Sequence, residues 1–253
     1  MKFLAIASSS KGNSSYLETK DIKALIDVGI SYTKIKKALK EIDVNISEIT
    51  HVFITHEHSD HIKGLKMLLK HHSPKVYLTE GTNSYLKLEN ANIIKALEKV
   101  VISDLSVLPI PLSHDAKEAV GFVLEKENKS ICYITDTGYI INELISLLEN
   151  HTLYYLESNY DPFTLLHSKR PYHLKKRIID EKGHLSNEES AYYFSILKGD
   201  KTKYLIHSHI SEECNTLKKI KETFDTVLRV QGEGTEFKRY YALPNESTEL
   251  IIL

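Results

Sequence analysis

Short runs of apolar residues, many of them β-branched or aromatic, recur along the whole chain and are separated by polar stretches. Runs of this kind, only a few residues long, are typical of buried β-strands. We expect most of them to form strands. They lie at 3–7, 14–18, 23–27, 51–55, 75–78, 106–110, 119–125, 130–135, 153–157, 203–207, 226–230, 236–241 and 248–252.

A second pattern, with apolar residues three and four positions apart, predicts amphipathic helices. Ile35, Leu39 and Ile42, for example, fall on one face of a helix. The segments with this pattern are 32–42, 62–71, 139–148, 186–197 and 212–223. Because helices interleave with strands, the sequence predicts a mixed α/β architecture. No repeat and no linker-like tract divides the chain, so we expect one domain over residues 1–253.

Composition and charge narrow the class of protein. Lys and Arg number 33 against 34 Asp and Glu, a net charge of −1, so no overall positive field attracts nucleic acid, and such a contact needs a local patch. Cys132 and Cys214 form no CxxC pair and no disulfide framework, so we expect reduced thiols in a cytoplasmic protein. The opening apolar run ends at Ser8, too early for a signal peptide, and no apolar run approaches the ~18 residues that span a bilayer.

The densest chemical signal is the segment His56-Glu57-His58-Ser59-Asp60-His61. It follows the apolar run 52–54 directly and precedes a helical pattern, so it is expected to be a loop between a strand and a helix. Three imidazoles and a carboxylate so close together can fold around one or two cations from a loop, and Zn²⁺ and similar ions bind both groups. A polar loop with solvated histidines is the alternative interpretation.

Further ligand candidates stand where other strand-like runs end. His114 follows the run 108–112, and Asp136 follows 131–135. Rigid strand ends are a usual position for ligands, although each residue alone is also an ordinary polar turn residue. A third run leads into His207 and His209, and strand periodicity cannot choose between these two, since both would share one face.

The order of these residues resembles the metallo-β-lactamase superfamily over essentially the whole chain. The resemblance implies a four-layer αββα sandwich and two metal ions. The implied roles are a first metal on His56, His58 and His114, a second metal on Asp60, His61 and the last histidine, and Asp136 bridging the two.

Within the superfamily, several segments resemble the bacterial YycJ/WalJ/VicX branch. They are Ser8–Ser14, Leu156–Asp161, Gly183–Asn187 and His209–Asn215. This likeness selects His209 as the last ligand, whereas Ser9 departs from the glycine that the branch usually has there. The branch implies a 5′ to 3′ DNA exonuclease, with nucleic acid as partner and a functional link to a two-component signalling system.

Two of these segments are also similar to motifs of ribonuclease Z relatives. By that analogy His184 is the general acid that protonates the leaving group, and Glu157 orients it or stabilises its charge. A structural alternative exists for His184, because Ser186 and Glu189 form a capping box that starts the following helix. Both interpretations can hold together, since the cap would fix the histidine in place.

The resemblance thus implies phosphodiester hydrolysis, with a metal-bridging hydroxide as nucleophile that Asp60 helps to orient. The metals are Zn²⁺ or Mn²⁺, with iron also compatible. The polar interval 166–186 is expected to be an exposed insertion over the site. Its cations Lys169, Arg170, Lys175, Lys176 and Arg177 would bind phosphates beside Tyr172, although a solvated face explains the same cluster.

Other functions use the same scaffold. A carbonyl-directed hydrolase of lactones, thioesters or β-lactams is one alternative, and a ribonuclease of the tRNA-processing type is another. The pair Glu157 and His184 favours phosphodiesters, and carbonyl hydrolases mostly lack it. A metal-binding partner of a signalling system without catalysis is the third alternative, and a complete ligand set disfavours it.

Overall fold

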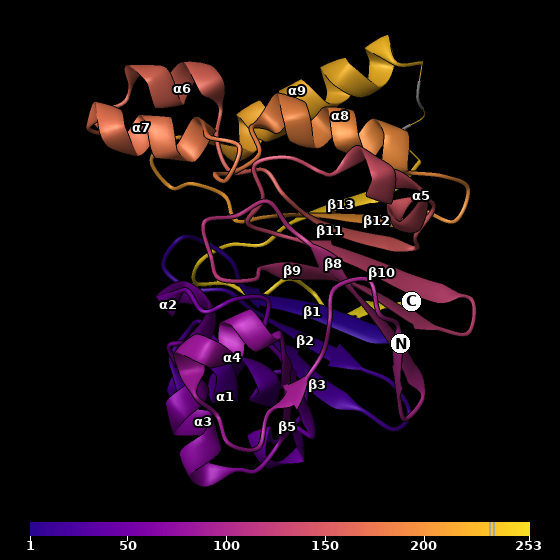
Figure 1. Ribbon diagram of the computed structural model, residues 1–253. Coiled ribbons are helices and arrows are strands. Elements are labelled where there is room, and N and C mark those ends of the chain that lie inside the picture. Colours follow the sequence, from indigo (N-terminus) through magenta and orange to yellow (C-terminus); the bar gives the residue numbers. More distant parts are fainter. Residues whose placement is uncertain (233, 235) are drawn as a thin grey trace. The chain divides into compact units, whose positions relative to one another are not determined.

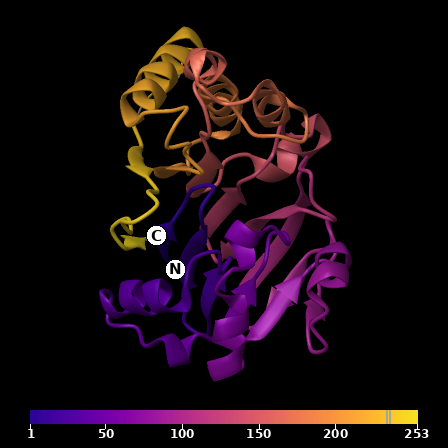
Figure 2. The same cartoon turned by 90° about the vertical axis from the view of Figure 1, so that its left-hand side faces the viewer.

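Residues 1–232, 234 and 236–253 are described by a computed structural model, drawn as ribbons in Figures 1 and 2. Two units are distinguished by their internal contacts. The first comprises Met1–Pro111, Ala116–Lys129 and Ala242–Leu253, and the second comprises Leu112–Asp115 and Ser130–Tyr241. The single domain expected from the sequence stays a prediction.

The first unit contains a seven-stranded mixed sheet in the order β14-β1-β2-β3-β4-β5-β6. The strands are β1 (Lys2–Ala7), β2 (Ser14–Glu18), β3 (Lys23–Ile26), β4 (His51–Phe53), β5 (Lys75–Leu78), β6 (Asn92–Ile93) and β14 (Ile251–Ile252). Pairing is antiparallel from β14 to β3 and parallel from β3 to β6. Three further strands, β7 (Val100–Ile102), β8 (Leu105–Pro111) and β9 (Val120–Lys126), pair antiparallel.

Helices cover one face of the seven-stranded sheet (Figure 1). They are α1 (Tyr32–Lys40), α2 (Ser59–Ile62), α3 (Leu65–His71) and α4 (Glu80–Leu86), with a 3₁₀ turn at Ile46–Glu48. Leu39 of α1 and Leu68 of α3 are fully buried in one apolar cluster with Val52 of β4. The spacing of apolar residues predicted from the sequence therefore marks the faces of α1 and α3 that pack on the sheet.

Phe122 is expected to be among the largest single contributors to stability in the first unit. It is fully buried on β9, and its ring lies 5.8 Å from that of Phe53 on β4, so the two sheets of this unit pack through this pair. Phe122→Ala should lower the free energy of unfolding by about 3–5 kcal/mol, measured by urea denaturation. Tyr85→Ala, which removes a mostly exposed aromatic ring in the same unit, should change it by about 0.5 kcal/mol or less. If both variants lost the same free energy of unfolding, the Phe122 ring would not be a core element.

The second unit is built on the parallel strands β10 (Lys129–Ile134), β11 (Leu153–Glu157), β12 (Tyr204–Ser208) and β13 (Lys238–Tyr241). Its helices are α5 (Ile145–Leu148), α6 (Pro162–His167), α7 (Tyr172–Ile179), α8 (Asn187–Leu197) and α9 (Leu217–Val230), with a 3₁₀ turn at Asn142–Leu144. Phe194 of α8 packs edge-on against Tyr154 of β11 and lies 6.2 Å from Phe224 of α9. Figure 1 shows α8 and α9 along the same face of β11–β13.

Most predicted strands and helices are present, and one strand prediction is wrong. Residues 226–230 belong to α9, because Phe224 and Leu228 continue a buried face that begins at Ile220 with four-residue spacing. This helix begins after the N-cap Thr216 rather than at residue 212. The sequence pattern missed α4, α6, α7, β6 and β7.

None of the helices in the described part of the chain combines the length and apolar character needed to cross a membrane.

Candidate metal centre and active site

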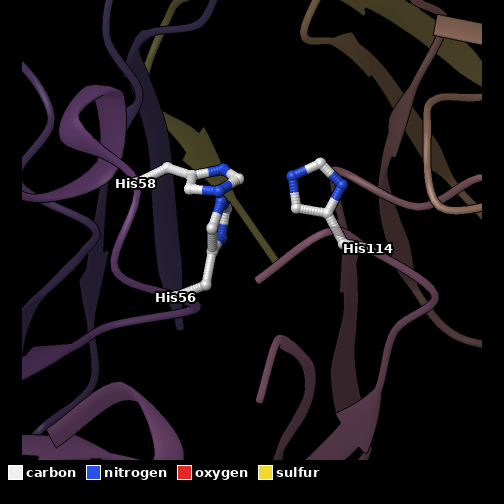
Figure 3. Close-up of side chains that lie close together, drawn as sticks. All are labelled: His56, His58 and His114. Atoms are coloured by element: carbon white, nitrogen blue, oxygen red, sulfur yellow. The ribbon is translucent and has the colours of Figure 1, made fainter. Parts of the chain in front are cut away.

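The first unit gathers four of the predicted ligands on one loop and one helical turn. His56 follows β4, His58 is the N-cap of α2, and Asp60 and His61 lie in its single turn. The ring centroid of His56 lies 4.6 Å from that of His58 and 4.1 Å from that of His61. Figure 3 shows the edge-to-face arrangement of His56 and His58 on this loop. The expected loop is present but shorter than predicted: it ends at His58, and Asp60 and His61 lie in the helical turn α2.

The buried carboxylate of Asp27 orients His61. Asp27 follows β3, its φ is +59°, and its Oδ2 lies 2.8 Å from His61 Nδ1. Its Oδ1 accepts the backbone N–H of Thr55 at 2.9 Å. Burial raises the pKa of Asp27, and the nearby His61 opposes that rise. A carboxylate that holds one nitrogen of a histidine in this way turns the other nitrogen toward a metal.

Asn13 reaches the same histidine from the opening loop. Its amide Nδ2 lies 3.1 Å from His61 Nε2 and 3.3 Å from Asp60 Oδ2, and its backbone N–H donates to the Asp60 carbonyl at 2.8 Å. Gly29 completes this contact, since a Cβ there would lie 1.6 Å from the Asp60 carbonyl oxygen. With Nδ1 donating to Asp27, Nε2 accepts from Asn13, which is the protonation state that a metal ligand needs.

Asp27→Asn is expected to weaken divalent metal binding by about 10- to 100-fold, since an amide no longer fixes the tautomer of His61. The measurement is competition for Zn²⁺ with a chromophoric chelator. Asp43→Asn is the matched control, because Asp43 is exposed and also has a positive φ, of 58°. Equal metal affinity in the two variants would remove Asp27 from the metal-supporting set.

The second unit places its candidate residues at the carboxyl ends of parallel strands. Asp136, Glu157 and His209 follow or end β10, β11 and β12, respectively. His209 Nδ1 lies 3.3 Å from Asp136 Oδ1 and 3.5 Å from Glu157 Oε2. Together with His184, these residues offer ligand atoms that all lie within 4.8 Å of one another. Asp136 and His209 also have φ values of +58° and +49°, and such strained backbone is typical of functional sites.

Glu157 and His184 form a hydrogen-bonded pair. His184 Nδ1 lies 3.1 Å from Glu157 Oε2, while Glu157 Oε1 accepts the backbone N–H groups of Thr137 and Leu185 at 2.9 and 3.0 Å. Burial alone would raise the pKa of Glu157, but His184 and His209 together lower it to about 2. The carboxylate is therefore ionised and held in place, so that it can stabilise a protonated His184.

The two histidines of β12 and its end have different surroundings. His207 is fully buried, stacks on Tyr241 at 5.1 Å and meets the Phe224 ring edge-on at 4.4 Å. Burial and the nearby Arg239 lower its pKa to about 3, so it is a neutral core residue. His209 instead lies beside Asp136, and the Asn159 side chain donates to its backbone oxygen at 2.8 Å.

His114 is also in the second unit and is labelled in Figure 3. Its ring centroid lies 5.5 Å from that of His184, and its Nε2 lies 3.5 Å from Asp115 Oδ1.

The sequence interpretation assigned no role to three supporting residues, Asp27, Asn13 and Asn159. The available signals were weak: Asp27 is the last residue of the strand-like run 23–27 and precedes a glycine-containing turn, and Asn13 ends a polar loop.

Each unit thus supplies imidazole nitrogen and carboxylate oxygen atoms in a buried setting. Divalent ions such as Zn²⁺ and Mn²⁺ accept this mixture of donors, and Asp27 provides the supporting contact that metal-binding histidines usually have. The residues therefore fit divalent metal ions.

The comparisons with known proteins place the chain in a family. Residues 23–208 match the β-lactamase superfamily domain, and the chain belongs to that superfamily. More particularly, it belongs with WalJ- and YycJ-like proteins. It is 34% identical to Exodeoxyribonuclease WalJ of Streptococcus pneumoniae over 264 residues, 98% of this chain and 97% of the relative. It is 31% identical to Exodeoxyribonuclease YycJ of Bacillus anthracis over 242 residues, which cover 92% and 91% of the two chains.

Among solved structures, the chain is similar to the metallo-β-lactamase fold protein YhfI from Bacillus subtilis. The TM-score is 0.74 at 12% identity, with 98% of this chain and 99% of the other covered. At this identity the likeness concerns the fold alone. The predicted metallo-β-lactamase fold, an α/β sandwich, is confirmed.

Proposed function

We propose that this protein is a metal-dependent exonuclease that removes nucleotides from DNA in the 5′ to 3′ direction. The observation that carries the proposal is the Glu157–His184 pair beside Asp136, because such a pair can deliver a proton to a departing sugar oxygen. The exodeoxyribonuclease names of the two relatives support DNA as the polymer.

Two divalent ions are part of the proposal. His56, His58 and His114 would hold one, Asp60, His61 and His209 would hold the other, and Asp136 would be shared. When bound, the ions activate water and offset the negative charge of the phosphodiester.

The chain's own residues then position and move a proton. His184, protonated and hydrogen-bonded through Nδ1 to Glu157, gives its Nε2 proton to the oxygen that leaves phosphorus. Two backbone N–H groups hold Glu157 in place, and its carboxylate keeps the His184 ring oriented through the hydrogen bond to Nδ1. Asp60, fixed by Asn13, orients the attacking water.

The test is digestion of 5′- and 3′-labelled DNA and RNA by the purified protein with Mn²⁺ or Zn²⁺, and with EDTA as the metal-free control. We expect metal-dependent release of nucleotides from the 5′ end of DNA. Faster cleavage of RNA would move the assignment to a ribonuclease. Absence of cleavage of every nucleic acid by metal-loaded protein would reject the nuclease and favour lactone or thioester substrates.

A further inference from the structure

Helix α7 is an unusual element of the second unit because none of its side chains is buried. Its attachments are polar: Lys175 Nζ donates to the carbonyls of Leu166 and Ser168 at the end of α6, and Arg177 pairs with Asp115. Ile178 alone packs partly against a small cluster that contains Leu165. Figure 1 shows α6 and α7 at the opposite end of this unit's helical layer from α5. An eight-residue helix with so little apolar support suggests a role other than core packing.

The carboxyl half of α7 and the following turn form a pocket of about 320 Å³. Its lining residues are Asp115, His173, Lys176, Arg177, Asp180 and Lys182. Arg177 contacts Asp115 Oδ2 through Nε and Nη2, both at 2.8 Å. In the described part of the chain, the exposed ammonium groups of Lys176 and Lys182 have no carboxylate partner. Three cationic side chains against two carboxylates leave the pocket positive, which suits an anion.

The pocket adjoins the candidate proton donor. Asp115 directly follows His114, and the chain runs from Lys182 through Gly183 to His184. The His184 backbone N–H donates to the Ile178 carbonyl at 3.0 Å, and a Cβ on Gly183 would lie 2.2 Å from that same oxygen. The end of α7 is thus fixed against the residue that would protonate the leaving oxygen.

The position of the pocket indicates which part of the DNA substrate would lie beside it. When a nucleoside 5′-monophosphate is released from a 5′ end, the leaving oxygen is the 3′ oxygen of the departing nucleotide. Under the proposed function His184 protonates that oxygen, so a pocket next to His184 would lie on the side of the departing nucleotide. The anion carried by that nucleotide is its 5′-phosphate.

We propose that the pocket lined by Lys176, Arg177 and Lys182 binds the 5′-terminal phosphate of single-stranded DNA, a role that rests on the proposed exonuclease function. Tyr172 lies one helical turn before Lys176 on the same face of α7 and is 81% exposed. Its ring stacks on an unpaired base, which favours single-stranded over duplex DNA. The protein therefore selects 5′-phosphorylated over 5′-hydroxyl ends.

The test is fluorescence anisotropy of the metal-loaded protein with 3′-labelled single-stranded oligodeoxynucleotides that carry a 5′-phosphate or a 5′-hydroxyl, with phosphorothioate linkages to prevent cleavage. We expect the wild-type protein to bind the phosphorylated end about 10-fold more tightly. The double variant Lys176→Gln/Lys182→Gln should lose that preference. Lys218→Gln/Lys221→Gln, which removes two exposed charges from α9, should keep it.

Tyr172 supplies a second readout. Tyr172→Ala should weaken binding of both oligodeoxynucleotides by about 5-fold or more, whereas Tyr172→Phe should keep it. Equal affinity of wild-type protein for the two 5′ ends would overturn the proposal, even if the cleavage assay supports the exonuclease. Loss of binding to phosphatidylserine vesicles, with unchanged DNA binding in the α7 double variant, would assign the patch to a membrane and overturn it as well.

Discussion

Asp136→Asn is expected to lower DNA cleavage by about 10³-fold while leaving the protein folded. Asp136 has a φ of +58°, a conformation that asparagine tolerates far better than alanine, so the substitution preserves the turn after β10. Its carboxylate lies 3.3 Å from His209 Nδ1, and in the proposed function this negatively charged group would be a ligand shared by both metal ions. An amide has the same shape without the charge.

The measurements are kcat/KM on 5′-labelled DNA and metal content by elemental analysis, with the urea midpoint as the check on folding. Asp200→Asn, at an exposed turn, is the control and should match the wild-type protein. If Asp136→Asn kept both full metal content and full activity, Asp136 would have no place in the metal centre.

The four ligand candidates on the loop after β4 and in α2 could be predicted from the sequence because the information is local. His56, His58, Asp60 and His61 lie within six residues, and the apolar run before them and the helical pattern after them define the loop. Asp136 could be predicted from its place at a strand end, whereas Glu157 and the choice of His209 over His207 came from the family resemblance. Parallel strands bring their carboxyl ends to one edge, which is why Asp136, Glu157 and His209 lie together.

The supporting contacts could not be predicted, because they join segments that are far apart in the sequence. Asp27 and His61 are separated by 34 positions, and Asn13 and Asp60 by 47. No periodicity links such residues, and only the packed sheet brings them together. His207 shows the converse, since strand periodicity gives it the same face as His209, whereas the turn after β12 gives His209 different surroundings.

Helix α7 also lay beyond prediction from the sequence. Amphipathic patterns record burial, and α7 buries none of its side chains, so its short apolar pair Leu174 and Ile178 does not stand out from the basic residues around it. Most of the interval 166–182 is exposed, as expected, whereas Leu185 and Ser186 at its end are buried, and its helical structure depends on contacts such as that of Lys175 with the end of α6.

His184→Ala is expected to lower kcat on DNA by about 10²- to 10⁴-fold with little change in metal content, because general acid catalysis supplies about that factor. The substitution removes a partly exposed ring whose described contacts are with Glu157 and neighbouring site residues, so the fold should persist. Glu157→Gln should have a smaller effect on kcat, since it weakens the orientation and charge of His184 without removing the donor.

The leaving group separates proton donation from a general structural effect. Bis(p-nitrophenyl) phosphate releases a phenolate that is stable without protonation, whereas DNA releases an alkoxide that needs a proton. His184→Ala should therefore retain most of its activity on the nitrophenyl ester while losing DNA cleavage. Loss of both activities to the same extent would show that His184 supports the metal centre rather than the departing oxygen. Asp136→Asn provides the comparison, because a damaged metal centre should reduce both reactions together.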